Sequence, residues 1–184
     1  MWQRMQKMSI ANIPQKYLWL VDVNPPNIIK QGLALYGTLE RAGTASNPEI
    51  LAWASECGIP YGSDDIPWCG LYAAVVVKRA GWDVVKSPLW ARSWVNFGTK
   101  SPEAGLGDVL VFSRDGGGHV GFYVAEDTDF YHVLGGNQSD AVNIIRIRKN
   151  RLLDARRPAW RIKQPDSVKR YFVDASGAVS TNER

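Results

Sequence analysis

The sequence predicts an α+β protein, because apolar residues recur at helical spacing in its first half and short β-rich runs fill its second half. In the first half, proline and asparagine residues precede three apolar runs. In the second half, runs rich in Val, Ile, Phe and Tyr are separated by Gly, Asp and Asn. We therefore expect N-terminal helices packed on one side of an antiparallel meander.

Three helices are expected in the first half. The first covers residues 27–40, after Asn24-Pro25-Pro26, and ends where Arg41-Ala42-Gly43 begins. The second covers residues 49–57, because Asn47-Pro48 supplies a cap and a first-turn proline. The third runs from Pro67 to Arg79 and is stopped by a glycine.

The second half is expected to hold strands after a long loop. That loop covers residues 82–105 and contains one short helix over 91–97. The predicted strands cover residues 107–112, 119–125, 130–134 and 142–147. After Pro158 the hydrophobic pattern thins, and we expect residues 176–184 to form a frayed tail.

The length of 184 residues and the apolar content of 45% suit one globular domain. We expect an extension over residues 1–24, the main domain over 25–162, and a partly disordered tail over 163–184. The charged start of the chain is not followed by a signal-peptide core, and no run of about 18 apolar residues occurs. The expectation is a soluble chain made in the cytoplasm, without a signal peptide or transmembrane segment.

The charge balance is mildly basic. The chain has 22 Lys and Arg against 18 Asp and Glu, and its isoelectric point is near 9.1. Basic residues cluster over 146–157 and 161–170. Such a cluster suits an acidic polymer such as nucleic acid, teichoic acid or lipopolysaccharide, but a solvated face is the commoner cause. We therefore expect no nucleic-acid partner.

The two cysteines, Cys57 and Cys69, are too few for a disulfide framework, although a single bridge between them is formally open. They lie twelve positions apart, which does not match the close cysteine pairs of compact zinc sites. The chain also lacks a phosphate loop, a dinucleotide fingerprint and a Gly-x-Ser-x-Gly elbow. We expect no metal and no cofactor.

Cys69 and His119 are the candidate nucleophile and base. Cys69 begins an apolar helix, whose N-terminus can lower a thiol pKa and direct free N–H groups at an oxyanion. In a strand, His119 would share an open face with Gly121 and Tyr123. The structural alternatives are a small buried thiol and an ordinary surface histidine.

Asn137 is the candidate residue for orienting the imidazole, because its amide oxygen can accept from the far ring nitrogen and fix the tautomer. It is equally a plain turn residue, and Gln138 and His132 are rivals for the role. Candidate substrate-binding residues are Gln138 and three tryptophans that can stack on sugar or peptide or belong to the core: Trp68, Trp90 and Trp94.

Five motifs in order resemble the cysteine, histidine-dependent amidohydrolase/peptidase (CHAP) and NlpC-like superfamily, in particular a branch common in bacteriophages and prophages. The resemblance covers about residues 25–158. The motifs are Asp65-Ile66-Pro67-Trp68-Cys69-Gly70, Ala91-Arg92-Ser93-Trp94, Gly107-Asp108-Val109, Gly118-His119-Val120-Gly121 and Leu134-Gly135-Gly136-Asn137-Gln138.

The resemblance implies a papain-like fold and an endolysin-like, bacteriolytic cysteine peptidase or amidase that degrades the cell wall. It would cleave an amide bond of the peptidoglycan stem peptide, either as an endopeptidase or as an N-acetylmuramoyl-L-alanine amidase. Matching the motifs gives Cys69 as nucleophile, His119 as base and Asn137 as third member. Many CHAP members place Glu at the third position and many NlpC-like members place His.

The expected partner is bacterial peptidoglycan, and the chain is expected to act as a monomer after release by a holin, a phage particle or a secretion system. Two other functions stay open. One is a thiol transferase or deamidase that acts on proteins with the same three residues. The other is a non-catalytic wall-binding or virion structural domain.

Overall fold

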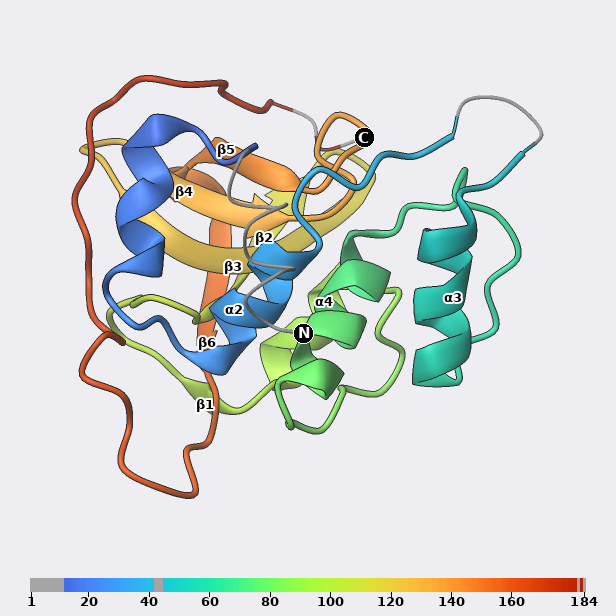
Figure 1. Cartoon of the computed structure of the whole chain (residues 1–184), viewed down its shortest axis with the longest axis horizontal. Coiled ribbons are helices and arrows are strands. Elements are labelled where there is room, and N and C mark those ends of the chain that lie inside the picture. Colours follow the sequence, from blue (N-terminus) through green and yellow to red (C-terminus); the bar gives the residue numbers. More distant parts are fainter. Residues whose placement is uncertain (1–11, 42–44, 182, 184) are drawn as a thin grey trace.

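A six-stranded antiparallel sheet with helices packed against it forms the core of the fold (Figure 1). The computed structural model describes residues 12–41, 45–181 and 183. The strands are β1 (Thr99–Lys100), β2 (Val109–Arg114), β3 (Gly117–Glu126), β4 (Phe130–Gly135), β5 (Asn143–Arg148) and β6 (Leu152–Arg157). Their order in the sheet is β1-β6-β2-β3-β4-β5. The predicted α+β class and antiparallel meander are confirmed.

The helices lie largely before the sheet in sequence. They are η1 (Gln15–Val21), α2 (Asn27–Ala34), α3 (Pro48–Cys57), α4 (Cys69–Arg79), η2 (Ala91–Asn96) and η3 (Lys149–Arg151), where η denotes a 3₁₀ helix. Within the described ranges, none of them has both the length and the apolar character that a bilayer crossing requires.

The cap signals place α3 as predicted. The Asn47 side chain accepts a hydrogen bond from the Glu49 amide at 2.8 Å, and Pro48 opens the helix. Gly58 ends it with a φ of 67°, a left-handed conformation that glycine adopts without a steric cost.

The helix predicted over residues 27–40 is shorter in the structure, where α2 ends at Ala34. Gly37 has a φ of 88°, which turns the chain out of the helical path. Beyond that turn, Leu39 pairs with Ala141 in an antiparallel bridge, and the Gly37 amide donates to the Val142 carbonyl. Residues 37–39 therefore pair with residues 141–142 and do not continue the helix.

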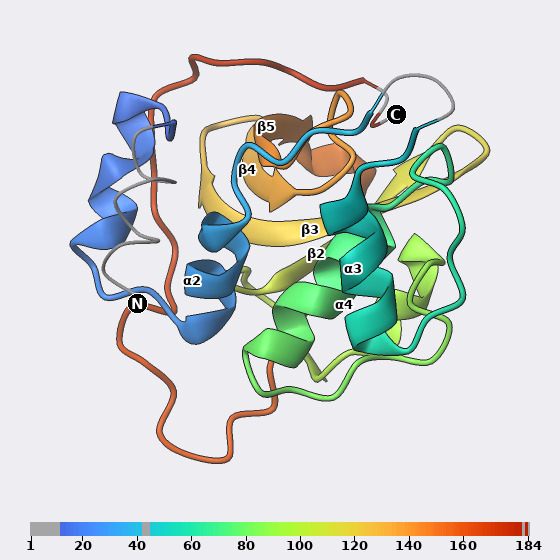
Figure 2. The same cartoon turned by 45° about the vertical axis from the view of Figure 1, so that its right-hand side comes forward.

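Helix α4 is the buried centre of the helical layer (Figure 2). Every residue from Cys69 to Val77 is buried, as expected for a helix that is apolar on all sides. Gly70 is needed for this packing, because a Cβ there would lie 2.1 Å from the Pro88 carbonyl oxygen. The start of α4 is thus pressed against the loop that leads to η2.

The two faces of β3 alternate as the sequence predicted. Val120, Phe122 and Val124 belong to the large core cluster shared with the helices. Tyr123 belongs to a second cluster of buried residues contributed mainly by the sheet. The predicted open face around His119 is wrong, because its side chain is fully buried.

Strand β6 and the short strand β1 were not predicted. Residues of β6 pair with β2 over Val109–Phe112, and β6 pairs with β1 on its other side. The Arg157 side chain contacts the buried Asp108 carboxylate at 2.8 Å, which holds β6 against the turn before β2. The arginine-rich sequence of β6 gives no alternation that would have revealed this pairing.

Residues before α2 join the core. Residues 1–11 of the predicted extension lie outside the described residues, but Ile13, Tyr17 and Leu20 are buried in the main cluster. The Tyr17 hydroxyl lies 2.6 Å from His132 Nδ1, and His132 Nε2 lies 2.9 Å from the Asp127 carboxylate. His132 therefore ties η1 to the sheet, and its contacts do not include His119.

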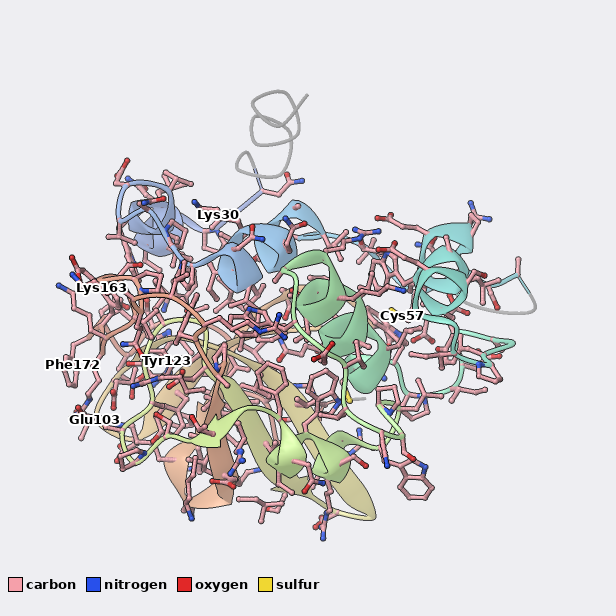
Figure 3. All side chains as sticks on the ribbon, turned by 90° about the horizontal axis from the view of Figure 1, so that it is seen from below. Lys30, Cys57, Glu103, Tyr123, Lys163 and Phe172 are labelled. Carbon is pink, nitrogen blue, oxygen red and sulfur yellow. The ribbon has the colours of Figure 1, made fainter. Side chains whose placement is uncertain are left out.

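The C-terminal segment, residues 163–181 and 183, follows the sheet instead of fraying. Phe172 bridges to Glu126 and Val179 bridges to Arg146. Figure 1 shows this segment, in red, running along the outer edge of the sheet. Figure 3 shows its labelled residues Lys163 and Phe172 at the edge where Glu103 lies. The described part of the predicted tail therefore pairs with the sheet at two bridges, although Phe172 and Val179 themselves are exposed.

Candidate active site

Cys69 is the first residue of α4, directly after Trp68, and is only 3% exposed. Burial raises the pKa of its thiol, although the backbone amides of Val120 and Gly70 and the Arg114 guanidinium act in the opposite direction. The expectation of a lowered thiol pKa is therefore wrong for this structure. Desolvation outweighs the amides at the helix N-terminus, and the thiol is neutral at rest.

His119 lies near the start of β3, one residue before the amide that acts on the Cys69 sulfur. Its Nε2 is 3.0 Å from Gln138 Oε1. In the part of the chain that the structure describes, its Nδ1 is buried without a hydrogen-bond partner. Burial lowers its pKa to about 4, while Glu183 and Gln138 act against that shift. The imidazole is therefore neutral at pH 7.

The hydrogen bonds of Gln138 assign the tautomer of His119. The Gln138 amide nitrogen lies within 3.2 Å of the Val133 carbonyl and within 2.9 Å of both side-chain and backbone oxygens of Asn143. The amide oxygen must therefore face His119, so His119 Nε2 is the donor. This leaves a lone pair on Nδ1, which is the atom that can accept a proton.

The side chain that contacts the far nitrogen of His119 is that of Gln138 and not that of Asn137. Asn137 has a φ of 56° and lines a cavity of about 380 Å³ together with Glu40, Asp65 and Asp140. Asn137 turns the chain, and the side chain of the next residue, Gln138, contacts the backbone of Asn143 at the start of β5. A substrate-binding role was also predicted for Gln138. Its side chain is fully buried in this structure and is not exposed at the surface.

Two of the three candidate substrate-binding tryptophans are core residues. Trp68 is fully buried and its ring nitrogen donates to the Glu40 carboxylate at 2.9 Å. Trp94 is fully buried and donates to the Pro88 carbonyl at 2.9 Å. In this structure neither ring has an accessible face, and both rings belong to the core. Trp90 is 75% exposed, and its role stays a prediction.

The second cysteine is separate from this site. Cys57 ends α3 and is half-buried, and Figure 3 shows it between α3 and α4. Both cysteines are free thiols. Across residues 12–41, 45–181 and 183, no group of three or more His, Cys, Asp or Glu side chains is arranged to hold a metal ion.

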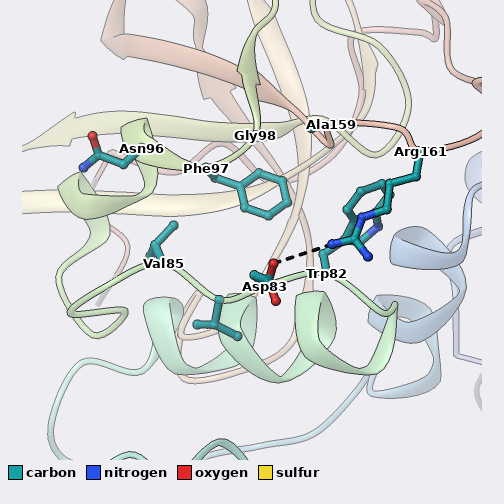
Figure 4. A pocket seen from close by; sticks show the side chains of 9 residues that line it. Trp82, Asp83, Val85, Asn96, Phe97, Gly98, Ala159 and Arg161 are labelled. Carbon is teal, nitrogen blue, oxygen red and sulfur yellow. Dashed lines mark ion pairs between the residues drawn. The ribbon is translucent and has the colours of Figure 1, made fainter.

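A different pocket lies beyond the C-terminal end of α4 (Figure 4). It has a volume of about 250 Å³, and its walls include Trp82, Phe97 and Arg161. Arg161 and Asp83 form an exposed ion pair across its rim at 3.7 Å. Because Cys69 is at the opposite end of α4, this pocket is not part of the candidate active site.

Three charged residues near His119 were missed by the sequence analysis. Arg114 ends β2, Arg151 ends η3, and Glu183 lies in the C-terminal segment. The Arg114 charge acts on the pKa values of both Cys69 and His119. No spacing or motif links these residues in sequence, so only the fold brings them together.

Acid is expected to destabilise the fold through His119. Its pKa is about 6.5 in the unfolded chain and about 4 in the folded one, so between these values the unfolded chain binds more protons. The free energy of unfolding should therefore fall as the pH drops from 6.5 to 4, by up to about 3 kcal/mol. Urea unfolding at pH 7 and pH 4.5 measures this. Between pH 7 and pH 4.5, the His119→Gln variant should lose less unfolding free energy than the parent. An equal loss in both proteins would contradict the lowered pKa of His119.

No known protein family, curated protein or solved structure matches this chain. The fold and the site define it as an α+β protein with a buried cysteine at a helix N-terminus, and with a histidine that a buried glutamine holds on the adjoining strand.

Proposed function

We propose that this chain is a cysteine hydrolase of papain-like fold that cuts an amide bond in peptidoglycan. One observation carries the proposal: Gln138 holds His119 with Nδ1 unprotonated and unpartnered, in a strand whose next amide acts on the Cys69 sulfur. A neutral imidazole with a free ring nitrogen, one residue before the amide that acts on a thiol at a helix N-terminus, supplies the two groups that nucleophilic catalysis combines. A purely structural histidine would have both nitrogens paired, as His132 has.

The proposed reaction starts from a neutral Cys69 thiol and a neutral His119 imidazole. As the Cys69 sulfur attacks the amide carbon, its proton passes to His119 Nδ1, and the carbonyl oxygen becomes an oxyanion near the Cys69 backbone N–H. The carbon–nitrogen bond then breaks, and the leaving amine takes the proton from His119. A water molecule, deprotonated by His119, hydrolyses the thioester and restores the thiol. Gln138 accepts from Nε2 throughout and keeps the ring in place.

The five ordered motifs direct the proposal to peptidoglycan, through their resemblance to CHAP and NlpC-like enzymes. The proposed enzyme is an endolysin-like monomer that uses no cofactor. It reaches the wall after release by a holin, a phage particle or a secretion system. Both the muramoyl–alanine amide and the peptide bonds of the stem fit the chemistry, because each is an amide that leaves a free amine.

Digestion of purified sacculi tests the proposal. The protein is incubated with sacculi in EDTA, and the released fragments are analysed by mass spectrometry. We expect muropeptides with new amino groups, whose masses identify the bond cut, and no release after alkylation of Cys69. Sacculi left intact by the folded, reduced protein would contradict a wall hydrolase. A mass change on an added protein would instead indicate a transferase or deamidase.

A further inference from the structure

Glu183 occupies a built binding site for a carboxylate. Its side chain is completely buried, and its two oxygens lie 2.8 and 2.7 Å from Arg151 Nη1 and Nη2, a bidentate pair. Arg114 donates to the Glu183 backbone carbonyl. Arg151 thus holds the carboxylate, and Arg114 holds the backbone of the same residue.

Arg151 is held in place independently of Glu183. Arg151 Nε donates to the Ser113 carbonyl at 3.0 Å, which fixes the direction of its guanidinium fork. Among the described residues, Arg114 Nε is buried without a partner, so this side of the site has an unused donor. Buried donors without partners are costly, and a ligand oxygen can satisfy them.

This carboxylate site adjoins the start of β3, which carries His119. In the β2–β3 pair Arg114 lies opposite Gly117, and Ser113, whose carbonyl accepts from Arg151 Nε, lies opposite Gly118. In keeping with this placement, the charges of Glu183 and both arginines act on the His119 pKa. The C-terminal segment reaches this place by pairing with β5, where the Arg146 amide donates to the Ala178 carbonyl and the Ser180 amide donates to the Arg146 carbonyl. Glu183 is therefore delivered to the site by a strand-like segment at the sheet edge.

We propose that Arg114 and Arg151 form a carboxylate-binding subsite of the active site, that Glu183 fills it at rest, and that a carboxylate of the substrate replaces Glu183 during turnover. Removal of the Glu183 carboxylate would leave the Arg151 guanidinium without its counter-ion in a largely buried site, which favours entry of another anion. The subsite rests on the proposed function and narrows its substrate class to peptides with a free carboxylate near the scissile amide.

Alkylation of Cys69 tests the subsite without requiring hydrolysis. The probes are iodoacetate, which carries a carboxylate, and iodoacetamide, which does not. In a Cys57→Ser background, Cys69 is the single thiol of the chain, and the ratio of the two rate constants reports how strongly the site draws a carboxylate. We expect Glu183→Gln to raise the iodoacetate-to-iodoacetamide ratio about tenfold.

Two further variants separate the subsite from simple opening of the site. Adding Arg151→Gln to Glu183→Gln should reverse the gain in the ratio. Arg161→Gln, which alters an exposed ion pair at the other end of α4, should leave it unchanged. An equal acceleration by both reagents in Glu183→Gln would overturn the proposal, because Glu183 would then be a steric plug. A thiol that reacts with neither reagent in that variant would overturn it too.

A matched pair of muropeptides extends the test to the proposed reaction. One member has free carboxylates and the other has them amidated. If sacculi are cleaved, we expect the amidated member to have a higher KM with little change in kcat, and Arg151→Gln to remove the difference. Equal KM values for both members in the parent would contradict the subsite. Selective alkylation without cleavage of sacculi would instead retain the subsite and refute the wall hydrolase.

Discussion

Replacement of Cys69 with alanine is expected to abolish release of muropeptides, with a loss of more than about 10⁴-fold in kcat/KM. The variant lacks the sulfur that attacks the amide, and no other described thiol is near His119, since Cys57 lies at the end of α3. The change removes one buried atom and should cost only about 1 kcal/mol of unfolding free energy. Fragment release and urea unfolding are measured on the same preparation.

The matched control for this variant is Cys57→Ser. It removes the second thiol of the chain from a half-buried position on α3 and should leave fragment release unchanged. A folded Cys69→Ala protein that still releases fragments would end the thiol mechanism. Loss of release in a folded Cys57→Ser protein would move the nucleophile to α3.

The second large effect is expected at Gln138. Gln138→Ala should lower kcat about 100-fold, the lower end of what a positioned general base contributes, because the His119 ring loses the acceptor that fixes its tautomer. The variant also removes the donor that Gln138 supplies to the Val133 carbonyl and to the oxygens of Asn143, so a loss of stability is expected as well. Asn137→Ala is the matched control and should retain most of the turnover.

A positioning role for Gln138 is separated from a structural one by Gln138→Glu. The carboxylate keeps the shape and still accepts from His119 Nε2, but its charge should raise the pKa of His119 above its low value of about 4. The acid limb of the kcat/KM profile should then move to higher pH. An unchanged acid limb in a folded, active Gln138→Glu protein would assign Gln138 to structure only, and a large loss in Asn137→Ala would restore Asn137.

Local signals in the sequence predicted much of the fold. The Asn47-Pro48 cap and Gly58 stop gave α3 within a residue, because a cap depends on groups within one helical turn. The alternation along residues 119–124 gave β3 and its two faces, because side chains in a regular strand alternate whatever the strand pairs with. These features are set by neighbours along the chain.

Local sequence likewise indicated some residues of the candidate site, and tertiary contacts were needed to identify the others. The sequence indicated Cys69 at a helix start and His119 on a strand, and it left Asn137 and Gln138 as rivals. Adjacent turn residues have the same local signal, and only the hydrogen bonds that the Gln138 side-chain amide donates to the carbonyls of Val133 and Asn143 separate them. The burial of two tryptophan rings was missed for the same reason, since ring accessibility depends on what packs over the ring.

By itself, the sequence determined the α+β class, the caps of α3, the strand alternation and the positions of the two residues proposed for catalysis. Only the tertiary structure decided that the Cys69 thiol and His119 are neutral, because burial is contributed by distant segments. It likewise decided that β6 joins the sheet and that Glu183 meets Arg151, contacts between segments with no shared local pattern. Pairing across long stretches of chain is set by the global minimum of free energy, which no short window of sequence contains.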